Sequence, residues 1–353
     1  MINSHYVPQF ILRNFYSDDK ITYCDMDNKT IEYRNTRSIF SEEGYYPENI
    51  ERDLCKKAEH QFANLYHNKL ENARKCLTIT ADELFVIKKY LVVSAIRFKG
   101  EMSEEEQRIS EELGPMFKND YDKSLNDVLA CETLEEMFSI VNLYGLSLGK
   151  MLFEQGNVDL ESLNIFLFGE LKEVLQSYMV FIKPRGDEKF IIPDSGRGYY
   201  RGPLGLRKME IPMRSGDPTV FSLIPRIGVR DYVIYPLSPN LAVLTMNIFF
   251  KLFTDSEIKT DLKLPPDYPT VSSILGFGSA DTICPPKVRM DGKTKEYIYE
   301  IKPVTTMDIC HLNDIMIAEA RRYVACAGLK SIQRSLKTVN NYTERDLSFM
   351  RLD

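Results

Sequence analysis

The residues from about 45 to 177 carry apolar positions at helical spacing. A long helix is predicted over 48–74, with an apolar stripe at Ile50, Leu54, Ala58, Phe62 and Leu65. The next helix opens at "TADE", where Thr80 and Glu83 predict a capping box, and it continues through "LFVIKKYLVVSAIRFK", which is apolar on most sides. The same spacing predicts helices over roughly 103–118, 122–155 and 158–177.

After residue 177 the pattern changes from helical to extended. The segments "SYMVFIKP", "EKFIIPD", "DYVIYPLS", "NLAVLTMN" and "KEYIYEIKP" are rich in Val, Ile and Tyr and are bounded by Pro, Gly or Asp, which predicts strands. A helix is predicted over roughly 307–327. Near the N-terminus, "KITYCDMDN" and "KTIEYRN" predict a β-hairpin.

Helices first and strands later predict an α+β fold and not an alternating doubly wound sheet. We expect one domain over residues 1–353. Its helix-rich N-terminal two-thirds, with a helical part at about 45–177, would pack with a mostly antiparallel sheet in a sheet-rich part at about 178–353.

Composition narrows the class of protein. The 353 residues are 44% hydrophobic and 27% charged, which is ordinary for a globular domain. A net charge of −6 argues against a wholesale nucleic-acid coat but leaves room for local basic patches. Seven scattered cysteines without a C-x-x-C spacing argue against a zinc knuckle or a disulfide framework. Without an apolar run of bilayer length or a signal peptide, we expect a cytoplasmic protein with no membrane partner.

The stretch "HYVPQFILRNF" at residues 5–15 concentrates polar chemistry. Pro8 is suited to the start of a helix, predicted over 8–16, and His5 lies just before it, where free backbone amides favour an anion. With Gln9 and Arg13, His5 could act as a general acid or base or contact a phosphate. Equally, the histidine could tie down the N-terminus through hydrogen bonds to the backbone.

A second group consists of Glu51 and Glu59 on one predicted helix and Arg97 on the next. Two carboxylates and a guanidinium can hold a divalent metal ion, Mg²⁺ or Mn²⁺, or position a polar substrate. At the border of an apolar stripe, such residues more often form an interhelical salt bridge.

The strand "YIYEIK" raises a nuclease hypothesis. Glu300 and Lys302, with Asp281 or Asp291 upstream, match the restriction-type pattern in which acidic residues hold a divalent cation and the lysine stabilises the attacking water or the phosphate. The alternative is a solvated strand face, because E-x-K after an apolar strand is a common pattern.

Residues 195–230 hold six glycines and seven basic residues against two acidic ones. Arg197 and Arg201, with Tyr199 and Tyr200, could stack on and neutralise a nucleic acid or a nucleotide. The alternative is a loop whose charge only keeps it solvated. The chain has neither a G-K-S/T phosphate loop nor a G-x-S-x-G elbow, which disfavours Walker-type ATP hydrolysis and an ordinary serine hydrolase.

The opening motif closely resembles the N-terminal signature of a mainly bacterial family, domain of unknown function 4238. Further features resemble that family in the same order along the chain: "GYYPENIERDLCKKAEHQF", "SAIRF", "PLSP" at 236–239 and "LNDIMIAEARRYV". Two departures stand out. The family's Ser-Asp-Asn-Pro is replaced by either Asp194 in "IIPDSG" or Asp217 in "SGDPTV", and the segment 250–305 reads as an insertion.

The resemblance implies a shared polar cluster of His5, Gln9, one or both glutamates, Arg97 and one aspartate, and it brings no established activity. The first hypothesis is therefore a hydrolase or nuclease-like enzyme acting on a phosphate-containing substrate, by analogy in antiviral defence. His5, Gln9, Glu59, Arg97 and Asp194 would be catalytic, and Arg13, Arg197 and Arg201 would bind substrate. The alternative is a non-catalytic binding or assembly protein that uses the loop at 195–230. For either function, nucleic acid or a nucleotide, or a second copy of the chain, is an expected partner.

Overall fold

The computed structural model describes residues 3–97 except 18 and 29, 121–153, 165–200, 232–246 and 286–328, together with the backbone of five short strands between 204 and 260. The predicted helix at 103–118, Arg201, Asp217 and Asp281 lie outside these residues, as does most of the loop at 195–230. The short strands are β9 (Leu204–Leu206), β10 (Met209–Glu210), β11 (Ser222–Leu223), β12 (Arg226–Gly228) and β15 (Lys259–Thr260).

The N-terminal segment forms small sheets around a short helix. Strand β1 (Asn3–His5) pairs antiparallel with β4 (Ser41–Glu43), and α1 (Gln9–Arg13) begins directly after Pro8. The predicted hairpin is confirmed as β2 (Ile21–Asp25) and β3 (Thr30–Arg34), and η1 (Thr36–Ser38) follows it.

The predicted long helix is confirmed and contains two π-helical turns. It consists of α2 (Glu48–Leu54), η2 (Cys55–Glu59), α3 (His60–Leu65) and η3 (Tyr66–Leu70), and its predicted apolar stripe is buried. After strand β5 (Cys76–Thr80), which the sequence did not suggest, α4 (Ala81–Arg97) begins at the predicted capping box. There the Glu83 carboxylate accepts from the Thr80 backbone N–H at 2.8 Å, and the Glu83 N–H donates to the Thr80 hydroxyl at 3.2 Å.

Two adjacent buried lysines let α4 hold two other helices. Lys88 donates to carbonyls at the C-terminal end of α8 (Ile165–Gln176), those of Val174 at 2.5 Å and Leu175 at 3.3 Å. Lys89 does the same for α6 (Tyr121–Ala130), donating to the carbonyls of Leu129 at 3.1 Å and Cys131 at 2.6 Å. The last carbonyls of a helix lack intrahelical partners and favour a cation, so each ammonium caps a helix end. The predicted helix at 122–155 is interrupted at residues 131–133 and so forms two helices, α6 and α7 (Leu134–Phe153).

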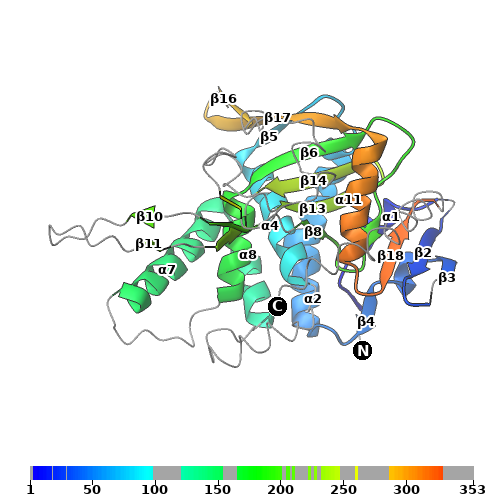
Figure 1. Cartoon of the computed structure of the whole chain (residues 1–353), viewed down its shortest axis with the longest axis horizontal. Coiled ribbons are helices and arrows are strands. Elements are labelled where there is room, and N and C mark those ends of the chain that lie inside the picture. Colours follow the sequence, from blue (N-terminus) through cyan, green and yellow to red (C-terminus); the bar gives the residue numbers. More distant parts are fainter. Residues whose placement is uncertain are drawn as a thin grey trace.

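A seven-stranded sheet runs through the centre of the molecule (Figure 1). Its order is β16-β17-β6-β14-β13-β8, and β5 pairs with the first part of β17. The strands are β6 (Tyr178–Pro184), β8 (Gly198–Tyr200), β13 (Tyr232–Ser238), β14 (Leu241–Met246), β16 (Lys287–Asp291) and β17 (Thr294–Val304). All described pairings in it are antiparallel except β17 with β6, which is parallel, so the sheet is mixed.

Both faces of this sheet are covered, which explains why its central strands are apolar without alternation. Phe181, Val233 and Val243 belong to a core shared with the helices between residues 48 and 176. Their neighbours Ile182 and Ile234 belong to a second core under α11 (Thr306–Ala318), which lies on the opposite face (Figure 1).

A second sheet, of order β3-β2-β18-β7, joins the two ends of the described chain. It combines β2 and β3 with β7 (Ile192–Pro193) and β18 (Tyr323–Cys326). The predicted helix at 307–327 was therefore wrong in its last part, because α11 ends at Ala318 and the chain turns into β18. The α+β class is confirmed, but the expected layout is not: strands β1 to β5 come from the N-terminal part, and both sheets combine segments from far apart in the sequence.

Candidate functional site

The structure links His5, Gln9 and Arg13 in one chain of hydrogen bonds. The Arg13 guanidinium donates to Gln9 Oε1 at 3.0 Å, which leaves the Gln9 amide nitrogen facing the His5 ring at 3.1 Å from Nε2. Since arginine can only donate, it fixes the orientation of the Gln9 amide, whose N–H group can donate to His5 in the tautomer that leaves Nε2 unprotonated. The same nitrogen lies 3.3 Å from the Thr36 carbonyl oxygen, the contact that a protonated His5 would use.

Arg97 lies between the two predicted glutamates. Its side chain is 1% exposed, its Nη1 pairs with Glu59 Oε1, and its Nη2 lies 3.6 Å from Glu51 Oε1. The side chains of Glu51 and Glu59 are 21% and 17% exposed, so the group reaches solvent through the carboxylates. Burial raises the pKa of Glu51, while the charge of Arg97 and the backbone N–H of His5 oppose that rise. We call His5, Glu51, Glu59 and Arg97 the N-terminal polar cluster. His5 joins it through its backbone N–H, while its buried ring contacts Gln9 and Thr36.

Asp194 is held by a different part of the chain. Its carboxylate accepts backbone N–H groups of Arg321 at 2.9 Å, Arg322 at 3.0 Å and Tyr323 at 3.0 Å. Burial raises the pKa of Asp194, and these hydrogen bonds oppose the rise. The aspartate fixes the turn that leads into β18. Burial and then the charge of Asp194 raise the pKa of Tyr6, so Asp194 lies near the opening motif.

The two remaining sets of predicted residues differ in exposure. Arg197 is bound bidentately by Glu170, with both distances at 3.0 Å, so its guanidinium braces β8 against α8. Glu300 is 61% exposed and pairs with Lys302 at 2.7 Å on the face of β17. Asp291 aligns with Thr294 at the start of β17, six residues or about 20 Å from Glu300, so Asp291 cannot share a cation with that glutamate.

Among the side chains that the structure describes, no group of three or more His, Cys, Asp or Glu is arranged to hold a metal ion. Glu51 and Glu59 could still provide two ligands. A cation there would compete with Arg97 for both carboxylates.

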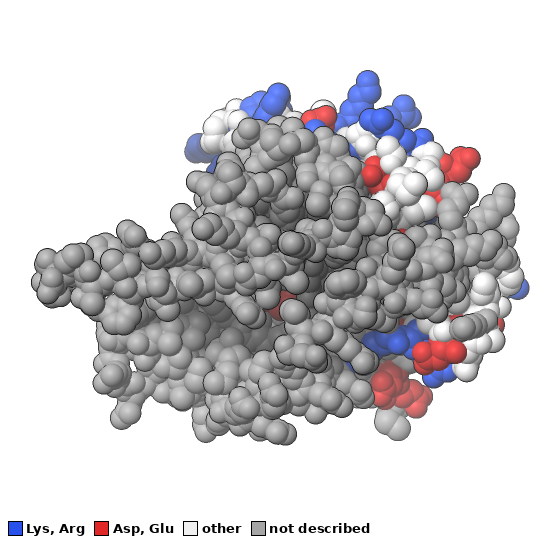
Figure 2. All heavy atoms as spheres, in the orientation of Figure 1, with Lys and Arg blue, Asp and Glu red and all other residues white. Residues whose placement is uncertain are grey.

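A basic edge, which the sequence reading missed, follows β16, β17 and the ends of β5 and β6. Figure 2 shows Lys and Arg side chains gathered along the top of the molecule, where Figure 1 places these strands. The basic edge consists of Arg74, Lys75, Lys183, Arg185, Lys287, Arg289, Lys293, Lys295 and Lys302.

The nine cations of the basic edge outnumber the acidic residues on it and beside it, which are Glu71, Asp187, Asp291, Glu296 and Glu300. Glu296 pairs with Arg289 at 2.5 Å, and Glu300 pairs with Lys302. Burial and then the charge of Arg74 lower the pKa of Lys183, so these two cations lie close together. In the sequence, the basic string "KVRMDGKTKEYIYEIK" indicated part of the basic edge. The cations at the ends of β5 and β6 join it only in the folded protein.

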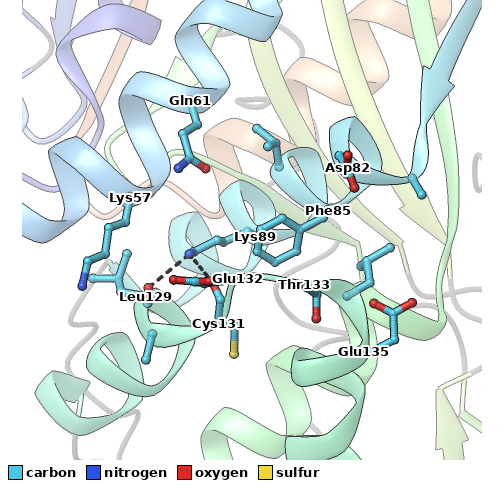
Figure 3. Close-up of a pocket in the computed structure, with 14 residues that line it drawn as sticks. Lys57, Gln61, Asp82, Phe85, Lys89, Leu129, Cys131, Glu132, Thr133 and Glu135 are labelled. Atoms are coloured by element: carbon cyan, nitrogen blue, oxygen red, sulfur yellow. Dashed lines mark hydrogen bonds between the residues drawn. The ribbon is translucent and has the colours of Figure 1, made fainter. Parts of the chain in front are cut away.

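A cavity of about 510 Å³ lies between α4, the helix at 48–70 and the connection from α6 to α7 (Figure 3). Lys57, Gln61, Asp82, Phe85 and Glu135 are among its lining residues, and Lys89 extends along it to the carbonyls of Leu129 and Cys131. Because Lys89 is already bound to a helix end, it is not free to act as a nucleophile or base in this cavity. The cavity contains none of the predicted site residues.

The described cysteines are all free, and Cys55 is exposed between Glu51 and Glu59 on the same helix. No helix among the described residues is long and apolar enough to cross a membrane.

The model of the family "Protein of unknown function (DUF4238)" matches residues 3–327, so the chain belongs to that family. No curated protein matches the chain, and no solved structure does either.

Proposed function

We propose that this member of a family of unknown function binds nucleic acid along the basic edge. The observation that carries this proposal is the concentration of nine cations on the β16–β17 hairpin and on the ends of the adjacent β5 and β6, in a chain whose net charge is −6. A phosphate backbone binds such a surface by releasing its counterions, whatever its sequence.

The shape of the basic edge is suited to binding a nucleic-acid strand and not a single phosphate group. Its cations come from a long hairpin and from the ends of two neighbouring strands, so they are spread along an edge and not gathered in a pocket. Arg74, Lys75, Arg185, Lys287, Lys293 and Lys295 are exposed and have no carboxylate partner among the described residues. Lys295 also lies 5.2 Å from the ring of Tyr297, which offers an aromatic face beside a cation.

Binding should be measured by fluorescence anisotropy with labelled single-stranded and duplex oligonucleotides of DNA and RNA. We expect affinity to fall steeply between about 50 and 200 mM salt, as phosphate contacts require. Replacing Arg74, Lys75 and Lys295 by Glu should weaken binding at low salt by at least about tenfold, because each lost contact lowers the salt slope by about 0.9.

The matched control reverses three exposed cations elsewhere, Lys20→Glu, Arg52→Glu and Lys56→Glu, with the same change in net charge. This control should keep most of the affinity. No binding at low salt, or an equal loss in both variants, would refute the proposal.

A second candidate function, hydrolysis of a phosphate-containing substrate, rests on the N-terminal polar cluster. A buried ion pair is often no better for stability than apolar residues of the same volume, so the burial of Arg97 between two half-buried glutamates calls for another reason. His5 would act as the acid or base, and Arg97 would stabilise negative charge. Because two carboxylates outnumber the one guanidinium, a phosphate would need Mg²⁺ or Mn²⁺ between it and Glu51 and Glu59.

Hydrolysis should be screened on RNA, DNA and nucleotides with Mg²⁺ or Mn²⁺, comparing wild type with His5→Gln and with the exposed control His67→Gln. We expect turnover to be lost only in His5→Gln, with a melting temperature near that of wild type. Turnover that survives His5→Gln, or that declines only as far as the variant unfolds, would remove this candidate.

A further inference from the structure

Among the residues that the structure describes, the outer strand of the seven-stranded sheet, β16, is paired on one side only. Strand β16 hydrogen-bonds β17 on one side, and every residue from Lys287 to Asp291 is exposed. Val288 is 57% exposed and Met290 is 63% exposed, which is unusual for apolar side chains on a regular strand. An edge of this kind is a ready template for another strand.

The hairpin that presents β16 is well defined. Asp291 pairs with Thr294 across a two-residue loop, and Gly292 adopts a φ of +61°, as a tight hairpin turn with glycine at its first position requires. Arg289 is neutralised within the hairpin by Glu296, whose carboxylate lies 3.0 Å from Nε and 2.5 Å from Nη2. The edge is therefore rigid, and its central cation is already paired.

The sequence of β16, "KVRMD", complements itself when read in the opposite direction. In an antiparallel pair centred on Arg289, Lys287 lies opposite Asp291 of the second copy, and Val288 lies opposite Met290 of the second copy. Residues directly opposite in such a pair share a face and interact. This register therefore gives one pair of opposite charges and one apolar pair on each side of the centre. A shift by one residue would break both matches.

We propose that β16 pairs antiparallel with β16 of a second copy of this chain, joining two seven-stranded sheets into one across a twofold axis at Arg289. The contact is isologous, so it closes into a dimer and leaves no further edge of the same kind. The dimer would also place two basic edges side by side. The proposal does not depend on nucleic-acid binding, since it concerns the backbone edge and the residues facing it.

The test is the oligomeric state of the full chain, measured by sedimentation over a range of protein concentrations. We expect a reversible monomer–dimer equilibrium in wild type. Asp291→Lys should weaken dimerisation by at least about tenfold, because it creates two like-charge contacts, one on each side of the axis. Lys287→Asp should weaken it in the same way.

The double variant Lys287→Asp/Asp291→Lys should restore the dimer, because the opposite charges face each other again and the net charge is unchanged. Circular dichroism on each variant checks that the hairpin change leaves the fold intact. The proposal would be overturned if wild type stayed monomeric at all concentrations. It would also be overturned if the single substitutions left dimerisation unchanged, or if the double variant did not dimerise like wild type. Because the double variant keeps all of its charge, failure here is distinguishable from failure of nucleic-acid binding.

Discussion

Single polar side chains join distant parts of this chain, and several of them belong to the family motifs. Asn14 of the opening motif donates to the carbonyl of Leu237 in "PLSP" at 2.8 Å. Asn313 is fully buried, donates to the Lys189 carbonyl at 2.9 Å, and accepts from the Ile191 N–H at 3.2 Å. With Asp194 at the turn before β18, these residues have a structural reason for their positions, because buried backbone groups need partners.

Asp314, next to Asn313, is different, because both of its carboxylate oxygens are buried without a hydrogen-bond partner among the described residues. Burial raises the pKa of Asp314 to about 7 from an ordinary 3.8. The folded protein therefore holds a proton that the unfolded chain releases, and stability is lost as pH rises from about 4 to 7.

Asp314→Asn should remove the loss of folding stability between about pH 4 and 7, because an asparagine side chain does not titrate. Because the side chain is only partly buried, we expect the variant to gain about 1 kcal/mol over wild type at pH 8 and almost nothing at about pH 4. Thermal unfolding at both pH values measures the difference, and Asp187→Asn on the exposed loop after β6 is the control. An equal effect at both pH values would contradict the assignment.

At the scale of elements, α4 organises the helical layer through Lys88 and Lys89. Burial lowers the pKa of Lys88 to about 8 from an ordinary 10.5. The unfolded chain then binds more protons than the folded protein between these values, so stability should rise with pH in this range.

Lys88→Met should abolish that rise. Between pH 7 and about pH 9.5, we expect the free energy of unfolding of wild type to rise by about 2 kcal/mol relative to that of Lys88→Met. Denaturant unfolding at both pH values measures it, with the exposed Lys56→Met as the control. A constant difference would mean that Lys88 keeps its ordinary pKa in the folded protein.

At the scale of the whole molecule, local signals in the sequence predicted elements well and their assembly poorly. The hairpin of β2 and β3, the Thr80 capping box and strands β6, β13, β14 and β17 follow from short-range pattern. The ion pairs of Glu51 and Glu59 with Arg97 were one of two alternatives in the sequence, because the glutamates border the apolar stripe of one helix and Arg97 ends the next. Strand β18 was missed because "YVAC" is short and continues the apolar spacing of α11. The basic edge was missed because β5 and β6 reach it only through pairing with β17.

The position of β18 between β2 and β7 has a consequence for biosynthesis. The neighbour of the hairpin at residues 21–34, the strand at 323–326, is synthesised about 290 residues later. At about 5–20 residues per second, the nascent hairpin waits roughly 15–60 s with one open side. Prematurely terminated chains that end before residue 323 would never acquire that neighbour, which makes them natural clients for chaperones and proteases.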